Sequence, residues 1–209
     1  MQTEFPPAPL DPNGPAMSTV ELLDEQSAPM LAQPFYAAGD PGPITRALAH
    51  VPELLEVALP FIGAALGPSA IDLRTKEIVI LRTSALLECR YCVQTHAVVA
   101  HDADLTGAQV DALAGEDPGT IATAFPAPAD RALIAWTDAV ALGPGTPPAA
   151  VAAALLAHVG EPDLVELTLL VGATLMLNRF ATSLGLPTSP ETLQAMADRG
   201  LLVGTDLAA

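Results

Sequence analysis

Residues 72–101 read DLRTKEIVILRTSALLECRYCVQTHAVVAH and contain the features that decide the fold. The aspartate that begins this stretch is a suitable N-cap for a helix over residues 73–87, and a second helix is expected over 90–101. The apolar run Ile78–Leu81 could be a strand, but the length of the segment and the absence of hairpin signals favour a buried helix. A chain reversal near Glu88 would make the two helices an antiparallel hairpin.

Prolines and glycines elsewhere in the chain recur at intervals that suit helices. Prolines mark expected starts at 52, 147, 162 and 190, and glycines mark expected ends at 67, 115, 143, 160, 185 and 200. Pro60 is expected to kink or divide the helix that begins at Pro52. No stretch alternates with a period of two, so the fold class is predicted to be all-α. Further helices are expected at about 106–115, 128–142, 147–159 and 162–184.

The predicted domain organisation has three parts. Residues 1–42 are rich in proline and read as an N-terminal arm, with a short helix expected at 18–25. Residues 43–200 form the helical domain, and residues 201–209 form a C-terminal tail. Met17 is a second plausible start of translation.

The composition excludes several classes of partner. The chain has 209 residues, of which 51% are hydrophobic, and its 8 Lys and Arg against 24 Asp and Glu give a net charge of −16. This charge repels phosphate backbones and anionic lipid heads, so neither nucleic acid nor a membrane is an expected partner. The first residues contain no basic segment followed by an apolar run, and the apolar segments are too short to span a bilayer, so a soluble, cytoplasmic protein is expected.

Four side chains form the candidate site. Cys89 and Cys92 are the two cysteines of the chain, and His96 lies four residues beyond Cys92, on the same face of the expected helix. A thiol in the first turn of a helix is easily ionised because the free amide N–H groups and the helix dipole stabilise the anion, and Arg90 lies nearby to add to this effect. The hairpin would place Glu77 opposite His96, in the order carboxylate, imidazole, thiol, which is a proton relay.

The spacing Glu-x11-Cys-x2-Cys-x3-His, filled here by Glu77, Cys89, Cys92 and His96, resembles the motif of the alkylhydroperoxidase D (AhpD)-like branch of the carboxymuconolactone decarboxylase family. Residues 47–55 and 177–187 also look like segments of that family. The resemblance covers about residues 43–187.

This resemblance implies an AhpD-like helical domain that assembles into dimers, trimers or hexamers. It implies a peroxidase of the peroxiredoxin type, in which Cys92 attacks a small-molecule hydroperoxide and Cys89 resolves the product. A redox-active disulfide would form, and a dithiol reductant or a reductase partner would reduce it. No cofactor and no metal are expected.

The chain departs from the family pattern at two positions. Well-characterised members carry a second histidine between the cysteines, where this chain has Tyr91. Many members also have a glycine-containing turn after the second helix, where this chain reads His101-Asp102-Ala103-Asp104. The first departure predicts weaker peroxidase activity than that of the best members.

Other interpretations of the same residues stay open. The cysteines could be small core residues, or they could bind zinc together with His96 and with Glu77 or His101. Glu77 and His96 could perform the acid–base chemistry of a lactone or keto-acid decarboxylase or hydrolase, with the thiols as spectators. The chain could also be a non-catalytic, redox-sensing helical oligomer. A homo-oligomer is expected in any case, since the apolar helices at 73–87 and 163–181 carry more apolar surface than one small helical layer can bury.

Overall fold

The structure is a computed structural model that describes residues 18–115 and 117–204. The first part of the predicted arm, which includes Met17, and the last five residues of the predicted tail lie outside the described residues.

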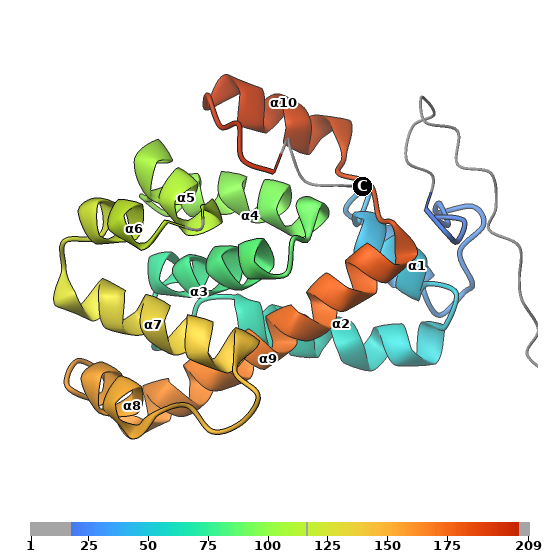
Figure 1. The fold of residues 1–209 in the computed structure, drawn as a ribbon. Helices are drawn as coiled ribbons and strands as arrows, with labels where there is room; N and C mark the ends of the chain where they lie inside the picture. Colours follow the sequence, from blue (N-terminus) through green and yellow to red (C-terminus); the bar gives the residue numbers. More distant parts are fainter. Residues whose placement is uncertain (1–17, 116, 205–209) are drawn as a thin grey trace, which may run out of the picture.

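The described residues form helices and no strands, which confirms the predicted all-α fold (Figure 1). Within residues 18–115 and 117–204, one short 3-10 helix, η1, precedes ten α-helices. Their bounds are η1 Gln33–Tyr36, α1 Pro43–Leu48, α2 Pro52–Leu66, α3 Leu73–Leu86, α4 Arg90–Asp102, α5 Gly107–Ala114, α6 Pro118–Ala124, α7 Pro128–Leu142, α8 Ala149–Leu156, α9 Glu161–Leu184 and α10 Pro190–Asp198.

Local capping explains why several helices begin and end where the sequence predicts. The Asp72 carboxylate accepts a hydrogen bond from the Thr75 amide at 2.7 Å and so caps α3. Thr106 and Gln109 form a reciprocal capping box at the start of α5. Gly185 ends α9 in the left-handed conformation, with φ of 60°.

Helix α3 is the centre of the fold and packs against α4, α5, α7 and α9 (Figure 1). The run Ile78–Leu81 lies within this helix, and all four residues are buried. A helix that is surrounded on every side needs apolar residues around its whole circumference, which explains why this run does not show an amphipathic pattern. The helical interpretation of the run is therefore correct.

Two expectations about local structure can be compared with the structure. Pro60 lies inside α2 and does not divide it. The expected helix at 18–25 is wrong, because these residues contain no helix. The turn-like residues Asp117 and Pro118 begin a helix, α6, because the Asp117 carboxylate caps it and proline suits a first helical position. His50 is exposed, and its Nε2 lies 2.8 Å from the Glu21 carbonyl oxygen.

The segment 18–42 packs against α1 and α2 as part of the folded body. The Tyr36 hydroxyl donates to the Leu23 carbonyl at 2.9 Å, and the Arg46 guanidinium donates to the carbonyls of Leu22 and Leu23. Leu55 of α2 completes a small apolar cluster with this segment. This packing brings the end of the segment to the candidate site.

Among the described residues, α9 alone has the length and hydropathy that a membrane span would need. It also packs against α2, α3, α4, α7 and α8. Central helices of water-soluble proteins share this length and composition, and the buried side of α9 belongs to the core.

Candidate active site

The turn between α3 and α4 forms the predicted hairpin. Glu88 has φ of 53°, in the left-handed region that residues with a Cβ seldom adopt. The Cys89 amide then donates to the Ser84 carbonyl at 3.0 Å, which closes the turn at the end of α3. This reversal places Cys89 at the start of α4 and aligns α4 alongside α3.

The two cysteines are joined by a disulfide, with their Cα atoms 5.3 Å apart. Cys89 is the N-cap of α4, and its Sγ accepts a hydrogen bond from the Cys92 amide at 3.4 Å. Both residues are buried, with exposures of 1% for Cys89 and 5% for Cys92. The N-terminal position that favours a thiolate is therefore present, as the sequence predicts.

Glu77 and His96 meet across the hairpin. His96 Nδ1 lies 2.9 Å from Glu77 Oε2. The Glu77 side chain is 2% exposed and the His96 side chain is 20% exposed. Because an ionised carboxylate only accepts hydrogen bonds, the contact places a hydrogen on Nδ1 and leaves Nε2 able to accept a proton.

A cavity of about 230 Å³ lies beside Cys92 and His96. It is lined by apolar side chains and by polar side chains from α1, α3, α4 and α9. The apolar lining is Pro41, Ile44, Leu59, Ile62, Leu66, Ile80 and Leu177, and the polar lining is Thr45, Ser84, Tyr91, Thr95, Thr174 and Asn178.

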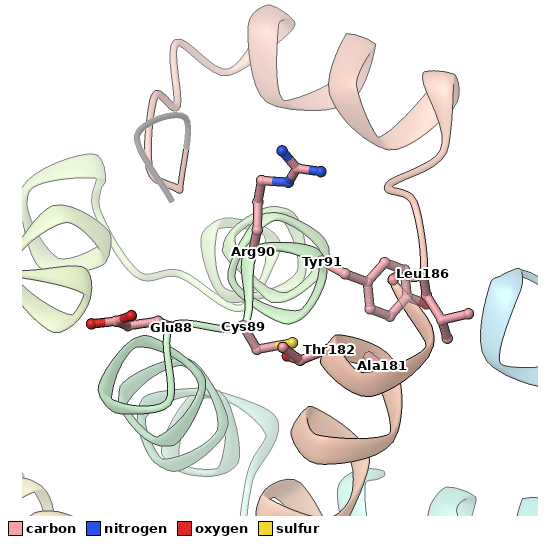
Figure 2. A pocket seen from close by; sticks show the side chains of 8 residues that line it. Glu88, Cys89, Arg90, Tyr91, Ala181, Thr182 and Leu186 are labelled. Carbon is pink, nitrogen blue, oxygen red and sulfur yellow. The ribbon is translucent and has the colours of Figure 1, made fainter. Parts of the chain in front are cut away.

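A second, much smaller pocket lies on the other side of the disulfide, between the start of α4 and the end of α9 (Figure 2). Cys89 lines this pocket, whereas Cys92 lines the larger cavity. The Arg90 side chain points away from the Cys89 sulfur, which does not match the expected help of Arg90 to a thiolate (Figure 2).

Tyr91, which stands between the two cysteines in the sequence, lines both the small pocket and the larger cavity. Burial raises the pKa of its phenol above the ordinary value of 10.0. A phenol that titrates so high stays neutral at pH 7, so it can donate a hydrogen bond but is a poor substitute for the imidazole as a base.

All four predicted site residues lie in one hairpin, and two further polar residues stand beside them. Ser84 Oγ lies 3.2 Å from Asn178 Oδ1, and both residues line the cavity. Sequence reasoning assigned no role to either. The one available signal is an asparagine inside the strongly apolar helix α9.

The described residues include no group of three or more His, Cys, Asp or Glu side chains placed to hold a metal ion. Of the side chains weighed for zinc binding, Cys89 and Cys92 are joined to each other, and Glu77 contacts His96 directly.

Comparisons with known proteins agree with the geometry. The sequence model of the carboxymuconolactone decarboxylase family matches residues 52–139, which include the whole α3–α4 hairpin. No curated protein matches the chain in sequence.

Three solved structures share the fold. An uncharacterized peroxidase-related protein from Ralstonia eutropha, described as an alkylhydroperoxidase AhpD core, aligns with a TM-score of 0.73 and 18% identity over 86% of this chain and 96% of its own. A peroxidase-related protein from Silicibacter aligns with a TM-score of 0.68 and 15% identity over 88% and 95% of the two chains. An Agrobacterium tumefaciens protein of unknown function, described in connection with AhpD and antioxidant defence, aligns with a TM-score of 0.59 and 22% identity over 68% and 95%.

At these identities the solved structures establish the fold alone. Over residues 52–139 the chain is similar to the carboxymuconolactone decarboxylase family, and its fold is AhpD-like.

Proposed function

We propose that this protein is a thiol-dependent peroxidase in which Cys92 reacts with a hydroperoxide. The observation that carries the proposal is the shared cavity, lined by Cys92 and by a histidine whose other nitrogen contacts a buried carboxylate. Substrate, nucleophile and base can meet there, and Glu77 is a positioning residue that holds His96 in the tautomer able to take the thiol proton.

The proposed reaction has two steps in the protein. His96 takes the Cys92 proton, and the thiolate attacks the terminal peroxide oxygen, so that the O–O bond breaks and Cys92 becomes a sulfenic acid. The proton held by His96 passes to the leaving oxygen, which departs as an alcohol, or as water when the substrate is hydrogen peroxide. The Cys89 thiol then displaces water from the sulfenic acid and forms the disulfide.

Regeneration requires two electrons from outside the chain. A dithiol, free or carried by a reductase partner, exchanges with the Cys89–Cys92 disulfide and is itself oxidised to a disulfide. The small pocket is lined by Cys89 and the larger cavity by Cys92, which supports separate approaches for the reductant and the hydroperoxide.

The assignment of cysteine roles can be tested by mass spectrometry after one equivalent of peroxide. Cys89→Ser should trap an oxidised Cys92, and Cys92→Ser should leave Cys89 largely reduced. The wild-type protein, reduced with a dithiol and treated in the same way, should return to the disulfide. The opposite pattern in the two variants would reverse the roles.

A second function is favoured by the Glu77–His96 contact itself, which needs no thiol. A buried carboxylate and an imidazole beside a cavity can perform acid–base chemistry on a lactone or keto acid. Lactone or keto-acid turnover that persists in the Cys89→Ser/Cys92→Ser double variant would support this function, and its loss would support thiol chemistry.

Assembly into a homo-oligomer also belongs to this proposal. Helix α2 exposes Leu54, Val57 and Phe61 on one face, and α9 exposes Leu169 and Met176. The two helices contact each other, so their exposed apolar residues provide a surface that a second copy can cover. Light scattering at micromolar concentration should give a mass above 21.4 kDa, and a monomeric mass would contradict the proposal.

A further inference from the structure

The cavity beside Cys92 contains a hydrogen-bond donor that is not used by the protein. Asn178 of α9 is 1% exposed, and its Nδ2 has no hydrogen-bond partner among residues 18–115 and 117–204. A buried amide without an acceptor destabilises a fold, so such a group beside a cavity is available to donate to a ligand or to water. Asn178 lines the same cavity as Cys92 and His96.

The orientation of the amide is held by a neighbouring helix. The fully buried Ser84 hydroxyl of α3 donates to Asn178 Oδ1 at 3.2 Å. Because the carbonyl oxygen is engaged there, the NH2 group is the part of the amide left to donate elsewhere.

Thr174 lies one turn before Asn178 on α9 and lines the same cavity, but its hydroxyl donates to the Leu170 carbonyl at 2.8 Å. Thr95 of α4 also lines the cavity, and its buried hydroxyl has no partner among the described residues. On the α9 side of the cavity, Asn178 rather than Thr174 therefore has a donor to offer to a ligand.

We propose that Asn178 Nδ2 binds the substrate by donating a hydrogen bond to its oxygen, and specifically to the oxygen that leaves when the O–O bond breaks. This inference rests on the proposed peroxidase function. Negative charge develops on the leaving oxygen as Cys92 attacks, and a donor held in a fixed position stabilises that charge. His96 then supplies the proton that converts the leaving oxygen to a hydroxyl group.

The chemistry of the cavity indicates which hydroperoxide this donor serves. The apolar wall, which includes Leu59, Ile62 and Leu66, can hold a small hydrocarbon group while Asn178 holds the oxygen. A substrate such as tert-butyl hydroperoxide uses both features, whereas hydrogen peroxide uses the donor alone.

The test compares Asn178→Leu with Thr174→Val, a control that removes a hydroxyl already bonded to its own helix. Two second-order rate constants of reduced protein are measured, one for tert-butyl hydroperoxide and one for iodoacetamide alkylation of Cys92 across pH. We expect Asn178→Leu to slow the peroxide reaction about tenfold or more while the alkylation profile stays unchanged. Thr174→Val should stay within twofold of the wild type in both reactions.

Two results would overturn the inference: a peroxide rate for Asn178→Leu within twofold of the wild type, or an equal fall in its alkylation rate. If circular dichroism shows that Asn178→Leu does not fold, the peroxide rate of Ser84→Ala is measured instead. This variant frees the amide to rotate and should slow the peroxide reaction severalfold, and an unchanged rate would overturn the inference.

A separate measurement distinguishes failure of the inference from failure of the proposed function. If wild-type protein does not react with tert-butyl hydroperoxide, the proposed function is wrong. Titration of the disulfide form with tert-butanol, followed by NMR, then tests the donor alone. Binding about tenfold weaker in Asn178→Leu than in the wild type supports Asn178 as an oxygen-binding residue, and equal binding rejects it.

Discussion

Lys76 and Glu77 are consecutive residues of α3, both buried, and their surroundings differ completely. Lys76 has an exposed fraction of 0%, and its Nζ donates to the Ala65 carbonyl at 3.1 Å, the Gly67 carbonyl at 2.5 Å and Glu166 Oε1 at 2.7 Å. An ammonium group has three donors, so every one of them is used. Lys76 thus connects the end of α2 to α9.

Glu77 contacts a histidine that itself lines a cavity. Arg82, one and a half turns further along α3, resembles Lys76 instead: it contacts both carboxylate oxygens of Asp138 and donates to the carbonyls of Leu113 and Gly115. The partners of these side chains divide the buried charges of α3 into two kinds. A charge whose donors all end on the protein supports the fold, whereas a charge that polarises a group beside a cavity supports chemistry.

The largest expected effect is that of Glu77→Gln on reactivity. The amide keeps a hydrogen bond to His96 but loses the charge that stabilises an imidazolium, so we expect peroxide consumption to fall by about 10²–10⁴-fold. The free energy of unfolding should change by less than about 1 kcal/mol, because the shape and the hydrogen bond are retained. Stopped-flow kinetics measures the peroxide rate, and urea denaturation measures the free energy of unfolding. If Glu77→Gln is unstable but fully active, Glu77 supports the fold, as Lys76 does, and not the chemistry.

Lys76→Met should show the opposite behaviour. Removal of the Lys76 ammonium leaves the Ala65 and Gly67 carbonyl oxygens and Glu166 without the hydrogen bonds that it donates. We therefore expect the free energy of unfolding to fall by about 3 kcal/mol. The peroxide rate of the folded fraction should stay within about threefold of the wild type. Arg199→Met, which removes the exposed pair with Asp102, is the control and should shift the urea midpoint little.

A smaller effect is expected from the pH dependence of the Lys76 cluster, which consists of Lys76, Ser69 and Glu166. The hydrogen bond from Lys76 and a second from Ser69 lower the pKa of Glu166 below its ordinary value of 4.5. A carboxyl whose pKa is lowered on folding stabilises the protein above its unfolded pKa, and this contribution is lost as the pH falls through the lowered value. Urea unfolding of wild type and Glu166→Gln should therefore differ most at pH 7 and converge as the pH falls below about 4.5.

A difference between wild type and Glu166→Gln that grows on acidification would show that the carboxylate does not stabilise the cluster. The effect should be smaller than that of Lys76→Met, since the Glu166 side chain is 32% exposed and water screens its charge.

The smallest effect concerns the turn that brings Glu77 to His96 but does not touch the Lys76 cluster. Glu88 has a positive φ, and glycine adopts this conformation without strain, so Glu88→Gly should raise the free energy of unfolding by about 0.5–1 kcal/mol. Asp104, in the turn after α4, also has a positive φ, 67°, and Asp104→Gly should give a similar gain. Thermal denaturation measures both variants, and a loss of stability in both would contradict the argument.

Short-range signals in the sequence were sufficient for much of this molecule. The caps at Asp72 and Thr106 and the glycine that ends α9 act within a few residues, so the helices that they bound could be predicted. The positions of Cys92 and His96 on one face of α4 follow from helical spacing alone. The contact between Glu77 and His96 could be predicted as well, because a hairpin with one short turn leaves little freedom in register.

Other features depended on residues far apart in the chain. The burial of Lys76, whose partner Glu166 lies ninety residues further along, cannot be read from the neighbours of either residue. The same holds for Ser84 and Asn178, which face each other because α3 and α9 pack together, and for the packing of segment 18–42 against α1 and α2. Spacing and capping are local properties of a chain, but whether a buried polar group is satisfied depends on which helices surround it, and only the tertiary structure decides that.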